Sequence, residues 1–87
     1  MMRLKVEESG RSLHPSEAAV VVKTIDGQER LVVSRRSIKN GTVEVGWPLG
    51  ENDNAVLVEL PRETQTGAWR VWVSKDQLVD IEERMRA

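Results

Sequence analysis

The feature that most constrains the fold is a pair of β-branched runs on either side of Asp26-Gly27, in the segment AAVVVKTIDGQERLVVS (residues 18–34). An Asp-Gly dipeptide between two such runs favours a two-residue hairpin turn. With Ile25 paired to Gln28 across this turn, alternation assigns each side chain to one of two faces. The inner face then carries the pairs Val22–Leu31 and Val20–Val33, and the outer face carries Val21, Val32, Lys23 and Arg30.

The second half of the chain repeats this pattern. Residues 55–59 (AVLVE) correspond to residues 19–23 (AVVVK), and residues 70–74 (RVWVS) correspond to residues 30–34 (RLVVS). The repetition predicts two copies of one unit, residues 19–45 and 55–82. Carrying the register over gives the inner pairs Val56–Val73, Val58–Val71 and Leu60–Trp69, and the outer pairs Leu57–Trp72 and Glu59–Arg70.

Each unit is expected to end in a short helical turn and a brief strand. Ser34 and Ser74 are candidate caps of the two turns, and the strands are expected at residues 42–45 and 79–82. A C-terminal helix over residues 75–84 is the alternative, because Ser74 to Gln77 also reads as a capping box and the following apolar residues share one helical stripe.

These elements predict an all-β fold, a small SH3-like or OB-like barrel of about five or six strands. Closing such a barrel removes the aggregation-prone edges of an open sheet. Residues 18–87 are expected to form this single domain. Residues 1–17 mix charges with Ser, Gly and Pro without a sustained period, so we expect a flexible N-terminal arm there, with a short edge strand at Leu4 and Val6 as the alternative.

The segment VWVSKDQL (residues 71–78) resembles the closing strand of small bacterial and phage β-barrel proteins that read W-(I/V/L)-P-K-S-Q. Trp72, Val73, Lys75 and Gln77 match that pattern, while Ser74 and Asp76 replace the usual Pro and Ser. Those proteins are mostly uncharacterised. The resemblance therefore implies an SH3-like fold and no particular function.

Composition argues against most kinds of chemistry. The chain has no cysteine, one histidine (His14) and a net charge of −1. Hydrolytic triads and thiolate or histidine metal sites therefore lack their side chains, so we expect no catalysis, no metal and no cofactor. No run approaches the roughly 20 apolar residues of a membrane span, and nothing at the start reads as a signal peptide. We expect a cytoplasmic protein without membrane contact.

The outer face of the predicted sheet is unusually apolar and is the first candidate site. It carries Trp72, Leu57, Val21 and Val32, and Trp47 lies in the connector between the units. A sheet face of this kind is covered by the terminal segments, by a second copy of the chain or by another protein. We expect a non-catalytic interaction or regulatory module, with an unknown protein or a second copy as partner.

Nucleic-acid binding is the alternative function. Its candidate phosphate contacts are Arg30, Arg35, Arg36 and Lys39, which lie within ten positions of the first unit, and Lys75, which holds a corresponding place in the second. Trp72 would then stack on a base, as aromatic side chains of small barrels do.

Overall fold

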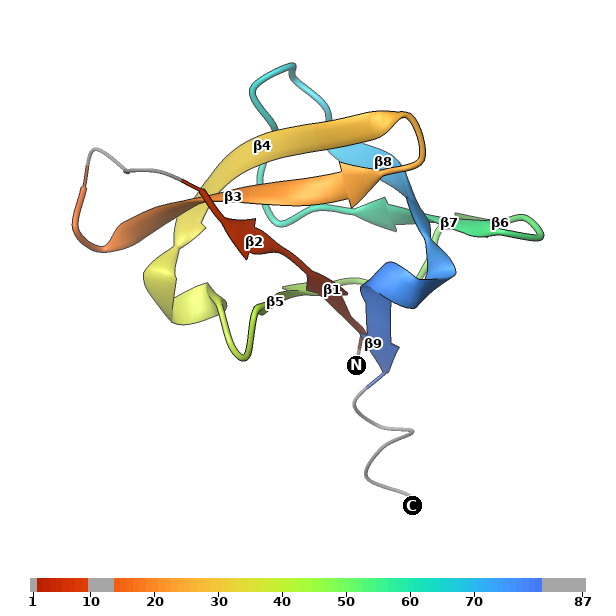
Figure 1. The fold of residues 1–87 in the computed structure, drawn as a ribbon, viewed down its shortest axis with the longest axis horizontal. Coiled ribbons are helices and arrows are strands. Elements are labelled where there is room, and N and C mark those ends of the chain that lie inside the picture. The colour runs from red at the N-terminus through yellow and green to blue at the C-terminus, as the bar shows by residue number, and fades with distance from the viewer. Residues whose placement is uncertain (1, 10–13, 81–87) are drawn as a thin grey trace.

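Antiparallel strands are the main secondary structure of the chain that is described (Figure 1). The computed structural model describes residues 2–9 and 14–80. The strands there are β1 (Met2–Lys5), β2 (Glu7–Glu8), β3 (Glu17–Thr24), β4 (Gly27–Ser34), β5 (Thr42–Val45), β6 (Gly50–Glu51), β7 (Ala55–Glu59), β8 (Arg70–Ser74) and β9 (Leu78–Asp80). Two 3-10 turns, η1 (Arg35–Ser37) and η2 (Lys75–Gln77), precede β5 and β9.

The strands form three small antiparallel sheets, in the orders β5-β1-β9, β2-β3-β4 and β6-β7-β8. The prediction of a mainly β fold is confirmed. The pairings among the described strands do not close into a barrel. Within the same residues, no helix is long and apolar enough to cross a membrane.

The first hairpin has the predicted faces but a different register. Lys23 pairs with Gln28 and Thr24 with Gly27, so the turn residues are Ile25 and Asp26 and the predicted pairing of Ile25 with Gln28 is wrong. Ile25 instead donates its backbone N–H to the Trp72 carbonyl at 2.9 Å, which removes it from the hairpin ladder. A shift of two residues leaves every side chain on its face. The predicted inner residues are accordingly all buried: Val20, Val22, Leu31 and Val33.

The second hairpin has the predicted register from Ala55–Ser74 to Glu59–Arg70. Leu60 extends it by donating its N–H to the Trp69 carbonyl at 2.8 Å, but the Trp69 side chain is 52% exposed. The expectation that Trp69 fills the core is therefore wrong. Both residues lie beyond the ends of their strands, where alternation no longer fixes a face, and Ala68 packs against the core instead.

The N-terminal residues differ from the predicted flexible arm. β1 lies between β5 and β9 and pairs with both, and Leu4 is fully buried between them. After Val6, whose N–H donates to the Gly41 carbonyl at 2.9 Å, the chain continues as β2 and pairs with β3. The pattern Leu4-Lys-Val6 is only one alternation long, too short to predict a central strand.

β5 and β9 hold equivalent places in the two halves of the chain, since each follows a 3-10 turn and pairs with β1. β5 matches its predicted strand. Residues 75–80 form η2 and β9 rather than the alternative helix, whose remaining residues 81–84 lie outside the described part. Neither Ser34 nor Ser74 makes a capping hydrogen bond. The Ser74 side chain instead bonds the Asp76 carboxyl group.

The loop of residues 60–69 lies along the outer edge of β4 (Figure 1). Gln65 donates its N–H to the Arg30 carbonyl at 2.8 Å, and Thr66 donates its hydroxyl to the Glu29 carboxylate at 2.7 Å. Hydrogen bonds from Thr66 and then from Thr64 lower the pKa of Glu29. The loop thereby occupies one backbone carbonyl, that of Arg30, which an exposed edge strand would offer to other chains.

We expect Leu4→Ala to destabilise the chain by about 2–5 kcal/mol, because it removes a fully buried side chain between two paired strands. Denaturant unfolding measures the change. Lys5→Ala is the matched control, since Lys5 is exposed on the same strand and its loss should cost less than about 0.5 kcal/mol. Equal stability of the two variants would contradict a central place for β1.

We expect Ser74→Ala to raise the pKa of Asp76. Hydrogen bonds from Ser74 and then from Gln77 hold the pKa of this carboxyl below its ordinary value. A carboxyl pKa lowered in the folded chain stabilises it above the ordinary value of about 4, and the contribution is lost as the pH falls through the lowered pKa. The wild-type chain should therefore lose more stability on acidification than the variant.

An NMR titration of the Asp76 side chain checks this expectation. Ser34→Ala is the control, because Ser34 precedes η1 and has no aspartate two residues later. The same Asp76 pKa in both variants would contradict the assignment.

Candidate functional site

Trp72 and Leu57 form a cross-strand pair on the outer face of the β6-β7-β8 sheet. Their strand neighbours are buried on the opposite face, so both side chains point away from the core. Gly50 of β6 pairs with Leu57, and a Cβ atom placed on Gly50 would lie 3.6 Å from both the Leu57 Cβ and the Trp72 Cη2. The indole ring therefore lies across Leu57 toward β6, over a residue without a side chain.

Two further apolar residues flank this pair. Ile25 is fixed to β8 by its N–H donation to Trp72, and Leu49 donates its N–H to the Leu57 carbonyl at 2.8 Å. Ile25 and Leu49 are each 52% exposed, and Trp72 is 38% exposed. We call Ile25, Leu49, Leu57 and Trp72 the Trp72 surface.

The structure separates the predicted protein-binding residues. Trp72 and Leu57 lie together, but Val21 and Val32 lie on the outer face of the β2-β3-β4 sheet. Val21 is buried in the wall of a groove, and Val32 is 36% exposed. Trp47 lies in the connector before β6, two residues from Leu49, and is 59% exposed.

Ile25 and Leu49 were missed by sequence reasoning. The Asp-Gly signal assigned Ile25 to the hairpin ladder, and Leu49 lies in a connector where no periodicity defines a face. Leu49 follows Pro48 and precedes Gly50, so its sequence signal is that of an ordinary turn. Only the contacts of their amides with Trp72 and Leu57 identify them as neighbours of the pair.

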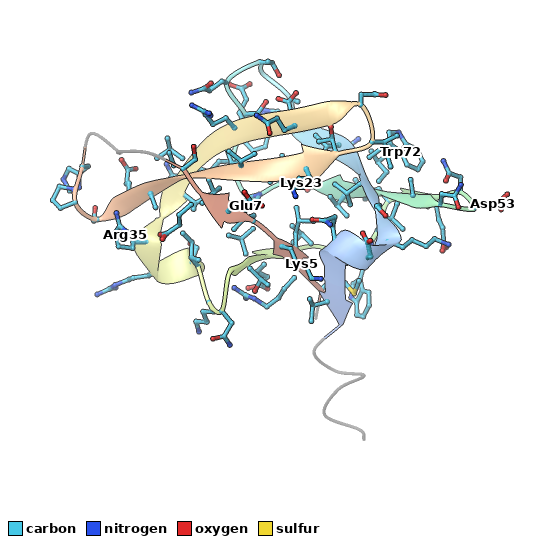
Figure 2. All side chains as sticks on the ribbon, in the orientation of Figure 1. Lys5, Glu7, Lys23, Arg35, Asp53 and Trp72 are labelled. Carbon is cyan, nitrogen blue, oxygen red and sulfur yellow. The ribbon has the colours of Figure 1, made fainter. Side chains whose placement is uncertain are left out.

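Acidic side chains border the Trp72 surface. Asp26 follows Ile25 in the first hairpin turn, and Asp53 lies in the turn between β6 and β7. Figure 2 shows Asp53 and Trp72 at the same end of the molecule. Neither aspartate forms an ion pair with a side chain of residues 2–9 or 14–80, whereas Glu51 is paired with Lys75 at 3.0 Å. The described side chains beside the Trp72 surface that lack an ion pair, Asp26 and Asp53, are therefore both negative.

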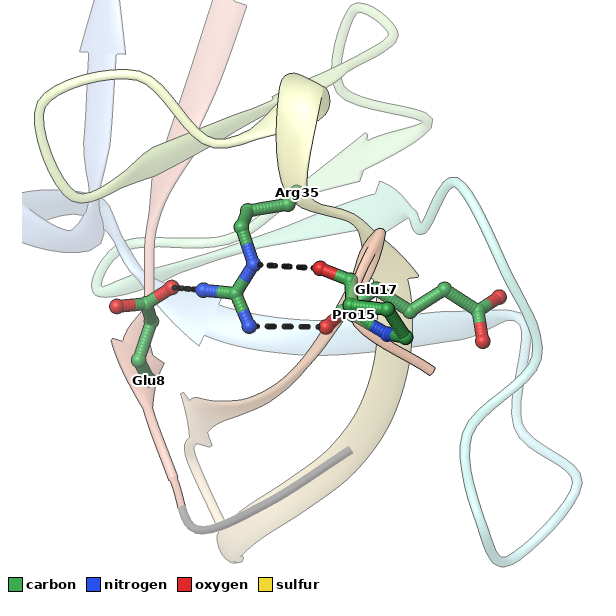
Figure 3. A network of polar contacts seen from close by, with 4 residues as sticks. All are labelled: Glu8, Pro15, Glu17 and Arg35. Carbon is green, nitrogen blue, oxygen red and sulfur yellow. Dashed lines mark hydrogen bonds and ion pairs between the residues drawn. The ribbon is translucent and has the colours of Figure 1, made fainter. Parts of the chain in front are cut away.

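Arg35, a predicted phosphate contact, holds the fold together instead (Figure 3). Its Nη1 lies 3.3 Å from the Glu8 carboxylate, its Nη2 donates to the Glu17 carbonyl at 3.0 Å, and its Nε donates to the Pro15 carbonyl at 3.3 Å. These contacts join η1 to β2 and to the start of β3. Most of the hydrogen-bonding capacity of this guanidinium is therefore used within the chain.

The other predicted phosphate contacts are dispersed. Lys75 is paired with Glu51, and Arg30 lies in the middle of β4. Arg36 and Lys39 alone line a common groove. The structure thus brings two of the five predicted residues together.

The residues that could carry acid–base or metal chemistry are the single histidine and the carboxylates. His14 is exposed, and its Nδ1 lies 2.6 Å from the Ser16 hydroxyl, a contact within one turn. In the described part of the chain no three acidic or histidine side chains are grouped closely enough to hold a metal ion.

Comparison with known proteins assigns no family. No protein-family model, no curated protein and no solved structure matches the chain. The likeness of residues 71–78 to the closing strand of small β-barrel proteins stays a prediction. The features of the molecule on which a proposed function can rest are the Trp72 surface and the two grooves lined by Val21 and by Arg36.

Proposed function

We propose that the chain is a non-catalytic protein-interaction module that binds its partner through the Trp72 surface. The observation that carries the proposal is the exposure of Trp72, Ile25 and Leu49 around Leu57, at one end of the molecule and on the face opposite the core. Grouped apolar side chains on a protein surface mark interaction sites. Tryptophan in particular is enriched among residues that dominate binding energy.

The charge around this surface defines the partner's chemistry. Asp26 and Asp53 border the apolar side chains without an ion pair to another described residue. Charge complementarity favours a segment that carries lysine or arginine beside its apolar residues. A lysine or arginine side chain over the Trp72 indole would add a cation–π contact. The proposed partner is therefore a protein segment of mixed apolar and basic character.

We also propose that the chain folds as an SH3-like or OB-like small barrel of two repeated hairpin units. The protein is proposed to be cytoplasmic. The continuity of β1 and β2 through Val6 supports the barrel, because one bent segment then contributes to two sheets. The bond from Ile25 to Trp72 supports it as well, since it links the first hairpin to the third sheet. The absence of cysteine fits a reducing compartment.

Peptide selection from a random displayed library on the full chain tests the proposed function. We expect the selected peptides to combine apolar residues with lysine or arginine and to lose at least about tenfold in affinity for Trp72→Ala, equivalent to about 1.4 kcal/mol. Trp69→Ala is the matched control, since Trp69 is exposed in the same hairpin but pairs with Leu60 beyond the strands. Affinities are measured by isothermal titration calorimetry.

Two outcomes would overturn the proposal. One is selected peptides that bind Trp72→Ala as tightly as the wild-type chain. The other is a wild-type chain that sediments as a dimer and dissociates on Trp72→Ala, because the surface would then be covered by a second copy.

A further inference from the structure

Two grooves flank the turn of residues 39–42, and the same three side chains line both: Arg3, Lys39 and Glu44. The first groove has a volume of about 760 Å³ and is also lined by Lys5, Glu7, Lys23 and the apolar residues Val6, Val21 and Val79. Figure 2 shows Lys5, Glu7 and Lys23 close together over this part of the molecule. The second groove, of about 520 Å³, is also lined by Arg36, Glu59 and the apolar residues Val43, Val45 and Leu60.

Arg3, between the grooves, is a buried cation that forms no ion pair with a carboxylate of residues 2–9 or 14–80. It is 7% exposed, and its Nε and Nη2 donate to the Thr42 hydroxyl (2.7 Å), the Ser37 carbonyl (2.9 Å) and the Thr42 carbonyl (3.1 Å). All of these acceptors are neutral. Glu44 is directly opposite Arg3 in the β1–β5 pairing, yet no ion pair joins them. Buried charges are usually paired with an opposite charge, whereas the Arg3 guanidinium is held by neutral acceptors and lines both grooves as a cation.

The other charged residues that line the grooves also carry a net positive charge. Three lining residues are neutralised, since Lys23 pairs with Glu7 at 3.5 Å and Glu59 pairs with Arg70 at 3.3 Å. Among the other lining residues that the structure describes, four cations face one carboxylate: Arg3, Lys5, Lys39 and Arg36 against Glu44. The whole chain has a net charge of −1, so this region is a local positive field on a nearly neutral molecule.

The edge of β5 offers backbone hydrogen bonds beside these cations. Thr42 exchanges its backbone bonds with Lys39 rather than with Lys5 of β1. In an antiparallel pair the bonded residues alternate, so Glu44 likewise directs its N–H and C=O away from β1, where no described backbone group bonds to them. Glu44 lines both grooves, and an extended chain beside it can pair with these groups.

We propose that these grooves bind an acidic polypeptide segment in extended conformation. Its carboxylates would lie near Lys5, Lys39 and Arg36, its backbone would pair with Glu44, and its apolar side chains would pack on the groove valines. A nucleic acid fits less well, because none of Trp47, Trp69 and Trp72 lines either groove to stack on a base. The apolar lining also has no counterpart on a phosphate backbone. This site is separate from the Trp72 surface and does not depend on the function proposed for it.

Fluorescence anisotropy with a fluorescein-labelled peptide of alternating glutamate and valine tests the proposal on the full chain. In an extended peptide these residues lie on opposite faces. We expect binding that weakens with salt and falls at least about tenfold in Lys39→Glu. Arg30→Glu is the matched control, with the same charge change at an exposed residue outside both grooves, and should retain affinity within about twofold. Trp72→Ala should leave the binding unchanged, which separates this site from the proposed function.

Three results would overturn the proposal. The first is no binding of the peptide at low salt, and the second is an equal loss of peptide affinity in Lys39→Glu and Arg30→Glu. The third is displacement of the peptide by a single-stranded oligonucleotide of equal charge, at a lower concentration than the unlabelled peptide requires. The last result would assign the grooves to nucleic acid. Circular dichroism confirms that the variants are folded. Lys39 is exposed and contacts Thr42 through its backbone, so its substitution leaves the turn bonds intact.

Discussion

The pairing of β1 with both β5 and β9 is the constraint on which the rest of the structure depends. The strand that follows each hairpin, β5 or β9, has a strand partner within the described residues only because β1 lies between the two. After Val6 the same segment becomes β2 and joins the first hairpin. Residues near the N-terminus thus connect elements from both halves of the chain. Arg3, which lies on this strand, is consequently buried where the two grooves meet.

A second contact, from the Ile25 N–H to the Trp72 carbonyl, determines the candidate interaction surface. It fixes the first hairpin turn against β8 and shifts the hairpin register by two residues relative to the prediction. The shift leaves the core unchanged, because side chains alternate with a period of two. It changes the surface, however, since Ile25 becomes an exposed neighbour of Trp72.

The two proposed sites differ in charge as well as in position. Aspartates border the Trp72 surface, whereas the grooves on either side of residues 39–42 contain an excess of cations. The net charge of −1 conceals this separation, because the opposite charges lie on different parts of the molecule. Other charged residues are held in ion pairs within the chain, such as Arg35 with Glu8 and Lys75 with Glu51. The fold therefore decides which charged side chains lack an ion pair.

The sequence by itself determined the mainly β class, both hairpins, the faces of their valines and the register of the second hairpin, because these follow from local alternation and turn chemistry. Tertiary structure decided the central place of β1, the exposure of Trp69 and the separation of Val21 and Val32 from Trp72. It also placed Arg3 between the grooves. These features depend on contacts between residues far apart in the chain. A period of two assigns a side chain to a face but does not say which other strand will lie against it.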